Sequence, residues 1–219
     1  MLIDTHFHLD FCPGFSPLVD VPVVAQTLSP HGFSIHPPTR FLSLGLHPWY
    51  ATKEAIAEFP RYAESARLIG EVGLDFARGT ACQVEAFARV LECVQPGSVL
   101  SIHAVRAVTA VLDMLESRPD VTRIIHWFSG TSDELTRHIR AGGFISVNPR
   151  MLATKRGRAY VKQVPGDRLL LETDLPAHGE TITPAEHARI LTATLDGISD
   201  LRGEDMRPQI EKTQEAIYL

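Results

Sequence analysis

The sequence predicts an α/β fold, a TIM-like (β/α)8 barrel whose first third is trimmed. Three observations predict it: short apolar runs alternate with segments of helical spacing, most of these runs are continuously apolar, and eight of them are present. A continuously apolar run is typical of a parallel strand buried on both faces, because a half-exposed strand alternates apolar and polar residues. Eight strand–helix units of this kind close into a barrel.

Each predicted strand ends in a polar or glycine-containing turn, which separates it from the next segment. In chain order, the predicted strands are Met1–Thr5, Pro22–Leu28, Phe41–Leu46, Leu68–Leu74, Val99–His103, Arg123–Trp127, Gly143–Val147 and Leu169–Thr173.

Several intervening segments carry their apolar residues at helical spacing, on one stripe. The predicted helices are Ala81–Cys93, Ala107–Glu116, Ser132–Ala141, His187–Leu195 and Met206–Tyr218. We expect the last two to cover the far side of the barrel.

The first third of the barrel is short. Little chain separates Asp10 from Val21, and Ser29–Arg40 is rich in proline and glycine. Neither stretch has a helical pattern, so two outer helices are expected to be lost or replaced by extended chain. No second domain is visible, and residues 1–219 are interpreted as a single domain.

Composition narrows the functional classes. Hydrophobic residues make up 44% and charged residues 21%, as in ordinary globular proteins, and the net charge of −5 provides no overall attraction to nucleic acid or membrane. No apolar run approaches the ~18 residues of a membrane span. Cys12, Cys82 and Cys93 lack metal-type spacing, and no signal peptide is visible, so we expect reduced thiols in a cytoplasmic protein. We also expect no obligate protein partner.

Metal-capable side chains lie at the ends of the predicted strands. All C-terminal strand ends of a parallel barrel open onto one face, so these side chains are expected to share a pocket. Imidazoles with carboxylates suit Zn²⁺, Mn²⁺, Fe or Co better than Ca²⁺, which prefers oxygen ligands. A single such histidine is more often a core residue, and a single aspartate is as often a helix cap, but the set predicts a metal-dependent hydrolase. Its members are His6, His8, Glu71, His103, His126 and Asp174.

The sequence resembles the TatD family of metal-dependent hydrolases. The segments that carry the resemblance, in family order, are DTHFHLD at 4–10, GLHPW at 45–49, GEVGLDF at 70–76, IHAVRA at 102–107, IHWFSG at 125–130 and LLLETDLP at 169–176. The resemblance implies a TIM-like barrel and deoxyribonuclease or phosphodiesterase activity with two divalent ions such as Zn, Mn, Mg or Fe. Two positions depart from the family pattern: Val105 stands where longer members carry arginine, and small residues and His178 follow Pro176. The trimmed first third and the GLHPW motif resemble a short subgroup of the family.

The resemblance also implies a role for each of seven side chains. His6, His8 and Asp174 would bind a first metal, and Asp174 would also act on the attacking water. His103 and His126 would bind a second metal, and Glu71 would bridge the two. His47 would face the substrate phosphate.

Substrate contacts are expected beyond the strand ends. Trp49 and Trp127 either stack on a planar group, such as a base of single-stranded DNA, or form an apolar pocket wall. Arg150, Lys155 and Arg156 either bind phosphates or belong to a solvated loop. Asp75 is expected to support a histidine ligand. The remaining histidines are predicted to lie at the surface: His31, His36, His138, His178 and His187.

Two other functions remain open at this point. One is an amidohydrolase that cleaves an amide or lactone with the same cations; Glu71, standing where a carbamylated lysine would bridge the metals, disfavours only the lysine-bridged type. The other is a non-catalytic scaffold that keeps a metal site for stability or partner binding.

Overall fold

The computed structural model describes residues 1–219, and its eight strands form one parallel sheet in sequential order from β1 to β8. The strands are β1 Asp4–His8, β2 Val23–Gln26, β3 Leu42–Leu46, β4 Leu68–Asp75, β5 Val99–Val105, β6 Thr122–His126, β7 Phe144–Val147 and β8 Leu169–Leu171. Beyond β8, a parallel bridge joins Phe7 to Leu175, and the His8 amide donates to the Leu175 carbonyl at 2.8 Å. The first and last strands therefore meet, and the predicted barrel is confirmed.

Strand β1 begins three residues later than predicted. The apolar-run criterion ended this strand at Thr5, before the polar residues His6 and His8. In the structure both histidines belong to β1, and His6 is fully buried. The barrel interior accepts these polar side chains because they find polar partners there, so hydrophobicity alone placed the strand too early.

The first third of the barrel is trimmed, as predicted, although one segment was assigned wrongly. Only the single 3-10 turn Leu9–Phe11 lies between β1 and β2. Between β2 and β3, the expectation of no helix is wrong, because α1 spans Pro30–Ile35. The Ser29 hydroxyl accepts from the Gly32 amide at 3.1 Å, and Pro30 occupies the first helical position. This cap starts a short helix despite the high proline and glycine content.

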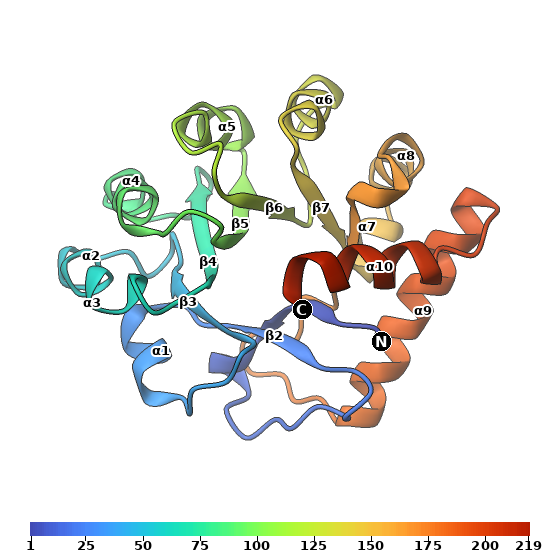
Figure 1. Ribbon diagram of the computed structural model, residues 1–219, viewed down its shortest axis with the longest axis horizontal. Helices are drawn as coiled ribbons and strands as arrows, with labels where there is room; N and C mark the ends of the chain where they lie inside the picture. The colour runs from blue at the N-terminus through green and yellow to red at the C-terminus, as the bar shows by residue number, and fades with distance from the viewer.

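The remaining helices fan around the sheet in Figure 1 and form the outer layer, except for the last helix, which lies across one end of the barrel. They are α2 Lys53–Glu58, α3 Pro60–Ala63, α4 Gln83–Cys93, α5 Val108–Leu115, α6 Ser132–Arg140, α7 Pro149–Leu152, α8 Lys155–Gln163, α9 Pro184–Arg202 and α10 Arg207–Tyr218, with a 3-10 turn at Gly166–Arg168. The main apolar core joins strand residues such as Leu100 to helix residues such as Val111. None of these helices is both long enough and apolar enough to cross a membrane.

The last helix covers the end of the barrel opposite the C-terminal strand ends. Ile217 and Tyr218 of α10 pack against residues near the starts of the strands, including Ile3. The Gln214 side chain pairs with both backbone groups of Ile3, at 2.9 and 2.6 Å, and the Arg40 guanidinium donates to the Tyr218 carbonyl at 2.9 Å. The prediction for the far side is therefore confirmed for α10.

Helix α9 differs from its prediction in length and position. It begins at Pro184, where the Thr183 hydroxyl accepts from the Glu186 amide at 3.2 Å, and ends before Gly203, whose φ is 70°. Both signals lie outside the apolar stripe that defined the predicted helix. The helix packs beside α7, α8 and β8, in the outer layer and not at the far end of the barrel.

Gly45 of β3 provides a test of how tightly the strands are packed. A Cβ atom at this position would lie 1.6 Å from the Thr27 carbonyl oxygen, which belongs to the backbone and cannot turn away. We expect Gly45→Ala to lower the free energy of unfolding by about 3 kcal/mol or more, measured by urea denaturation. Gly14→Ala, where nothing lies within 4 Å, is the control. Equal stability of the two variants would contradict this packing.

His138 and His187 are both fully buried, so their predicted surface positions are wrong. Each ring gains a partner that the sequence pattern does not reveal. His138 Nε2 bonds the Phe144 carbonyl at 2.9 Å and its ring lies against Gly143, while His187 Nε2 bonds Asp4 Oδ2 at 2.7 Å. His31 is exposed, and His36 is largely covered where it pairs with Asp10.

Burial lowers the pKa of His138 from 6.5 to about 4, with a smaller contribution from Arg123, although the bond to the Phe144 carbonyl opposes the change. Between pH 6.5 and 4 the unfolded chain binds a proton at His138, whereas the buried native ring stays neutral. The free energy of unfolding is therefore highest above pH 6.5 and falls as the pH drops from 6.5 to 4. The loss is about 3 kcal/mol. Urea unfolding at pH 7 and pH 4.5 should show a smaller pH effect in His138→Gln than in the wild type. Identical pH effects would contradict this assignment.

Candidate metal centre

A cavity of about 500 Å³ opens at the C-terminal ends of the strands, where the sequence placed the site. His6 lies fully buried outside the residues that line the cavity. The nine other predicted site residues all line it: His8, His47, Trp49, Glu71, His103, His126, Trp127, Arg150 and Asp174. Residues far apart in the chain thus meet at one end of the barrel.

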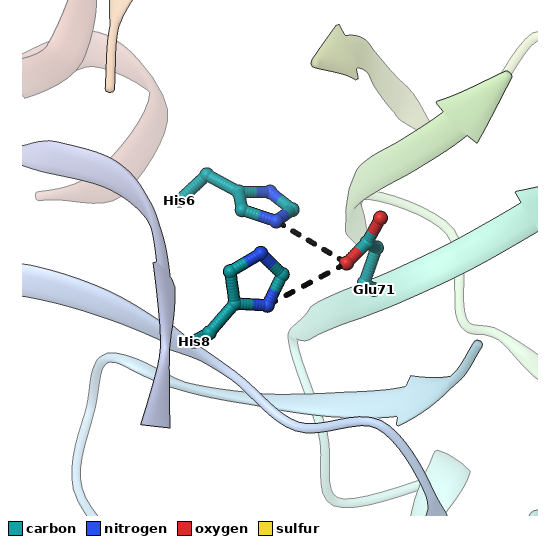
Figure 2. Close-up of side chains that lie close together, drawn as sticks. All are labelled: His6, His8 and Glu71. Carbon is teal, nitrogen blue, oxygen red and sulfur yellow. Dashed lines mark ion pairs between the residues drawn. The ribbon is translucent and has the colours of Figure 1, made fainter. Parts of the chain in front are cut away.

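Glu71 of β4 lies at the centre of the cluster, and each of its carboxylate oxygens faces a different group of imidazoles. Figure 2 shows the first group, in which His6 Nε2 and His8 Nδ1 both point at Glu71 Oε2, at 3.3 and 3.8 Å. His6 and His8 are two residues apart in β1, so their side chains project to the same side of the strand. Ser101 Oγ lies 2.8 Å from His6 Nδ1 and orients the ring.

The second group surrounds the other carboxylate oxygen. Glu71 Oε1 lies 2.6 Å from His103 Nδ1 and 2.9 Å from His126 Nε2. His103 belongs to β5 and His126 to the last position of β6, so neighbouring strands supply them. The Glu71 carboxylate therefore stands between a β1 pair and a β5–β6 pair.

Asp174 follows β8 and adds a second carboxylate beside the β1 pair. Its Oδ1 lies 3.0 Å from His8 Nε2 and 3.9 Å from His6 Nε2, and its Oδ2 accepts from Arg150 at 3.1 Å. The Asp174 backbone has φ of 57°, a conformation that costs a non-glycine residue energy. Its amide donates to the His6 carbonyl at 3.1 Å, which holds this strained position against β1.

His47 approaches the same carboxylate but differs in its hydrogen bonding. Its Nδ1 accepts from the Trp49 amide at 3.1 Å, so a neutral His47 carries its proton on Nε2. That nitrogen lies 3.3 Å from Glu71 Oε1. His47 therefore presents a donor to the cavity, whereas a metal ligand must present a lone pair.

The geometry fits divalent cations. Four buried polar atoms of the cluster lack any hydrogen-bond partner: His6 Nε2, His8 Nδ1, Glu71 Oε2 and His126 Nδ1. Unpaired buried polar atoms are rare, and an ion bound between the first three explains why they converge. Zn–N bonds of 2.0–2.1 Å put two ligand atoms of a tetrahedral site about 3.3 Å apart. Glu71 Oε2 lies at similar distances from His6 Nε2 and His8 Nδ1, 3.3 and 3.8 Å. Three sets of possible ligand atoms lie within 4.8 Å of one another inside each set: His6, His8 and Glu71; His6, His126 and Glu172; and His47, Glu71 and His103. In the third set His47 presents an N–H, so it does not serve as a ligand in that tautomer.

The charges of the cluster favour the ligand forms of Glu71 and His6. Burial raises the pKa of Glu71, but the imidazoles of His47 and His126 lower it by a larger amount, so the pKa lies well below its usual range. Burial, together with the nearby His126, lowers the pKa of His6. A charged carboxylate beside a neutral imidazole is the state that binds a cation. Burial lowers the pKa values of His8, His103 and His126, but the nearby carboxylates raise them by more, so a cation that binds these three imidazoles must displace a proton.

The predicted support by Asp75 is confirmed. Asp75 Oδ2 lies 3.3 Å from His103 Nε2 and accepts from the Trp49 indole at 2.6 Å. The Asp75 amide in turn donates to Gln83 Oε1 at 2.7 Å. One carboxylate therefore holds both a candidate ligand and a wall of the cavity.

Sequence reasoning missed two further acidic residues. Glu172 is fully buried; its Oε1 lies 3.7 Å from His126 Nδ1 and accepts from the side-chain amide nitrogen of Asn148 at 2.9 Å. Asp4 accepts from the His6 amide at 3.1 Å and from the Thr173 hydroxyl at 2.5 Å. The signal that could have found them is the two-residue period, since Asp4 precedes His6, and Glu172 precedes Asp174, by two positions.

The three basic residues predicted to contact phosphate, Arg150, Lys155 and Arg156, lie in different surroundings. Arg156 lies in α8 and donates to the carbonyls of Ser129 and Gly130, so it holds a loop in place. Lys155 is exposed at the start of α8, and neither residue lines the cavity. Arg150 alone of the three predicted phosphate contacts lines it. His178 is exposed, as predicted, and also lines the cavity.

A family model described as TatD related DNase matches residues 34–218 of this chain. The chain belongs to the TatD related DNase family. Its sequence is 32% identical over 168 residues to the "3'-5' ssDNA/RNA exonuclease TatD" of Edwardsiella piscicida, and 28% identical over 174 residues to "Deoxyribonuclease TATDN3" of Homo sapiens. These matches cover 69% and 75% of the TatD-family chain, and only 63% and 64% of the two relatives.

A solved relative has the same fold. The crystal structure of YjjV, a TatD homologue of Escherichia coli K12, superposes with a TM-score of 0.76 at 19% identity and covers 99% of this TatD-family chain and 97% of its own. The family model begins after His6 and His8, so their place in the cluster is an observation of the structure.

Proposed function

We propose that this TatD-family chain is a hydrolase of phosphodiester bonds that depends on divalent metal ions, with nucleic acid, including single-stranded DNA, as its substrate class. The observation that carries the proposal is the convergence of imidazoles and carboxylates on both oxygens of Glu71 inside one cavity. The names of the two relatives, an exonuclease and a deoxyribonuclease, support phosphodiesters as the substrate.

Two ions are the number that the geometry favours. His6, His8 and Asp174 would hold the first, and His103 and His126 would hold the second. Glu71 would serve both ions, since each of its oxygens faces one pair of histidines. Imidazole–carboxylate sites accept Zn, Mn, Fe and, less readily, Mg, so the choice of ion follows availability as well as affinity.

When bound, such ions lower the pKa of a coordinated water and stabilise negative charge on a phosphodiester. Asp174 would accept the proton of the attacking water. It is ionised and so has a free acceptor, because burial raises its pKa by less than the bond from His8 and the charges of nearby imidazoles lower it. The low pKa also makes it a weak base, so the transfer relies on a water whose own pKa the ions have lowered. His47 donates from Nε2 to a phosphate oxygen. Arg150, 3.1 Å from Asp174, supplies a positive charge beside the same position.

The two tryptophans have different roles toward the rest of the substrate. Trp127 is 38% exposed at the cavity, with the Arg150 guanidinium 5.4 Å from its ring centre, and its exposed surface is where a base would stack. Trp49 has its indole nitrogen fixed by Asp75 and forms a rigid wall.

The test is a metal-reconstitution assay with several substrate classes. Protein stripped with a chelator is expected to be inactive, and Mn²⁺, Zn²⁺, Mg²⁺ or Fe²⁺ should restore hydrolysis of bis(p-nitrophenyl) phosphate and of a short single-stranded oligothymidylate. Amides and lactones, the substrates of the alternative amidohydrolase function, should be cleaved much more slowly. Preferential cleavage of an amide or lactone would contradict the proposal, and inactivity with every ion and substrate would favour a non-catalytic scaffold.

A further inference from the structure

Arg78 is a cation of the cavity that has no charged partner. It follows β4, is exposed, and lines the cavity. Its guanidinium carbon lies 4.4 Å from the centre of the Trp49 ring. The side chain forms no hydrogen bond and no ion pair with the protein, whereas the guanidinium of Arg150 is engaged by Asp174.

The backbone that carries Arg78 is held in place. Asp75 Oδ1 accepts from the amides of Ala77 and Arg78 at 2.8 and 2.9 Å, and the Gly79 amide donates to the Asp75 carbonyl at 2.8 Å. The other oxygen of the same carboxylate fixes the Trp49 indole at 2.6 Å. Asp75 thus sets the turn and the ring beneath the guanidinium together, so little conformational entropy is lost when an anion binds there.

A guanidinium stacked on an aromatic face keeps the N–H donors along its edge available. Those donors match the oxygens of a phosphate, and the stacking partner restricts the side chain without neutralising its charge. The stack also covers one face of Trp49, so this tryptophan supports a cation here and offers less surface to a base.

The two arginines of the cavity have different neighbours. Arg150 touches the candidate ligand Asp174 directly. The Arg78 side chain forms no hydrogen bond or ion pair with any candidate ligand and stacks on Trp49, whose ring centre lies 6.1 Å from that of His103. The two arginines therefore suit two different anionic groups of one substrate, with Arg150 beside the reacting phosphate and Arg78 beside another.

We propose that Arg78, supported by Trp49, forms a second phosphate-binding subsite that receives a phosphate next to the one being cleaved. The enzyme accordingly prefers substrates with at least two phosphates, such as oligonucleotides, over single phosphodiesters. This inference rests on the proposed phosphodiesterase function.

The experiment compares a substrate with one phosphate, bis(p-nitrophenyl) phosphate, and one with several, a thymidylate pentamer, in metal-loaded protein. We expect Arg78→Met to lower kcat/KM for the pentamer about tenfold more than for the single phosphodiester, mainly through KM, and to reduce the salt dependence of pentamer binding by about one phosphate contact. Arg78→Lys should recover part of the loss. Arg61→Met, which removes an exposed arginine of α3 outside the cavity, is the matched control.

A second readout separates this inference from the proposed function. Binding of a fluorescein-labelled pentamer to metal-free protein, followed by anisotropy, needs no turnover, and we expect Arg78→Met to weaken it about tenfold. An equal loss on both substrates, or pentamer affinity unchanged relative to Arg61→Met, would overturn the subsite. Wild-type protein that binds the pentamer through Arg78 but cleaves neither substrate would support the subsite and refute the phosphodiesterase.

Discussion

Glu71→Gln is expected to lower kcat for phosphodiester hydrolysis by at least about a thousandfold. Both oxygens of this buried carboxylate face imidazoles, at distances from 2.6 to 3.8 Å. Glutamine has almost the same size but no charge, and its amide nitrogen cannot bind a cation. The variant should therefore lose the bridge between the two ion positions while the barrel stays folded.

Three measurements separate this effect from misfolding. Circular dichroism and urea unfolding should show a native barrel, elemental analysis should show fewer bound ions per chain than in the wild type, and kcat should be measured with each ion in excess. Glu85→Gln, which neutralises an exposed carboxylate of α4, is the control. Wild-type turnover in Glu71→Gln with any divalent ion would refute the bridging role.

For Asp174→Asn we expect a loss of similar size with a different signature. Asparagine keeps an oxygen near His8 and Arg150 but accepts a proton too weakly to serve as a base. Ion content should fall less than in Glu71→Gln, because His6 and His8 remain, while kcat falls at least about a thousandfold. Activity and ion content measured on the same preparation decide between loss of a base and loss of a metal.

Asp167→Asn, at an exposed position just before β8, is the matched control for Asp174→Asn and should keep wild-type kcat. Asp174→Asn protein that retains both its ions and its turnover would show that another group takes the proton of the water. Buried Glu172 is then the next carboxylate to substitute, since it lies 3.7 Å from His126 Nδ1.

The barrel was predictable because its strands are buried on both faces and therefore continuously apolar. That signal fails where the barrel interior is polar: it ended the first strand before His6, which lies fully buried in β1. Short helices such as α1 and α8 escaped it as well. Their starts depend on the caps Ser29 and Thr154, and apolar periodicity does not register a cap.

The convergence of the strand-end side chains was predictable because strand ends of a parallel barrel share one face, and ten predicted side chains lie in the cavity or in the cluster beside it. Lys155 and Arg156, which lie in α8 and not at a strand end, do not. The partners of buried side chains were not predictable. His187 is four-fifths of the chain away from Asp4, and only the fold brings the two together at 2.7 Å. Arg78 carries no signal in the sequence, and only the fold places its guanidinium 4.4 Å from the Trp49 ring.

The most direct test of the account is anomalous X-ray diffraction from crystals grown with Mn²⁺ or Zn²⁺. We expect two anomalous peaks at the C-terminal end of the barrel, one on each side of the Glu71 carboxylate, the first bound by His6 and His8 and the second by His103 and His126. An intact cavity without a peak at saturating ion, or peaks bound by other residues, would contradict the metal centre proposed here.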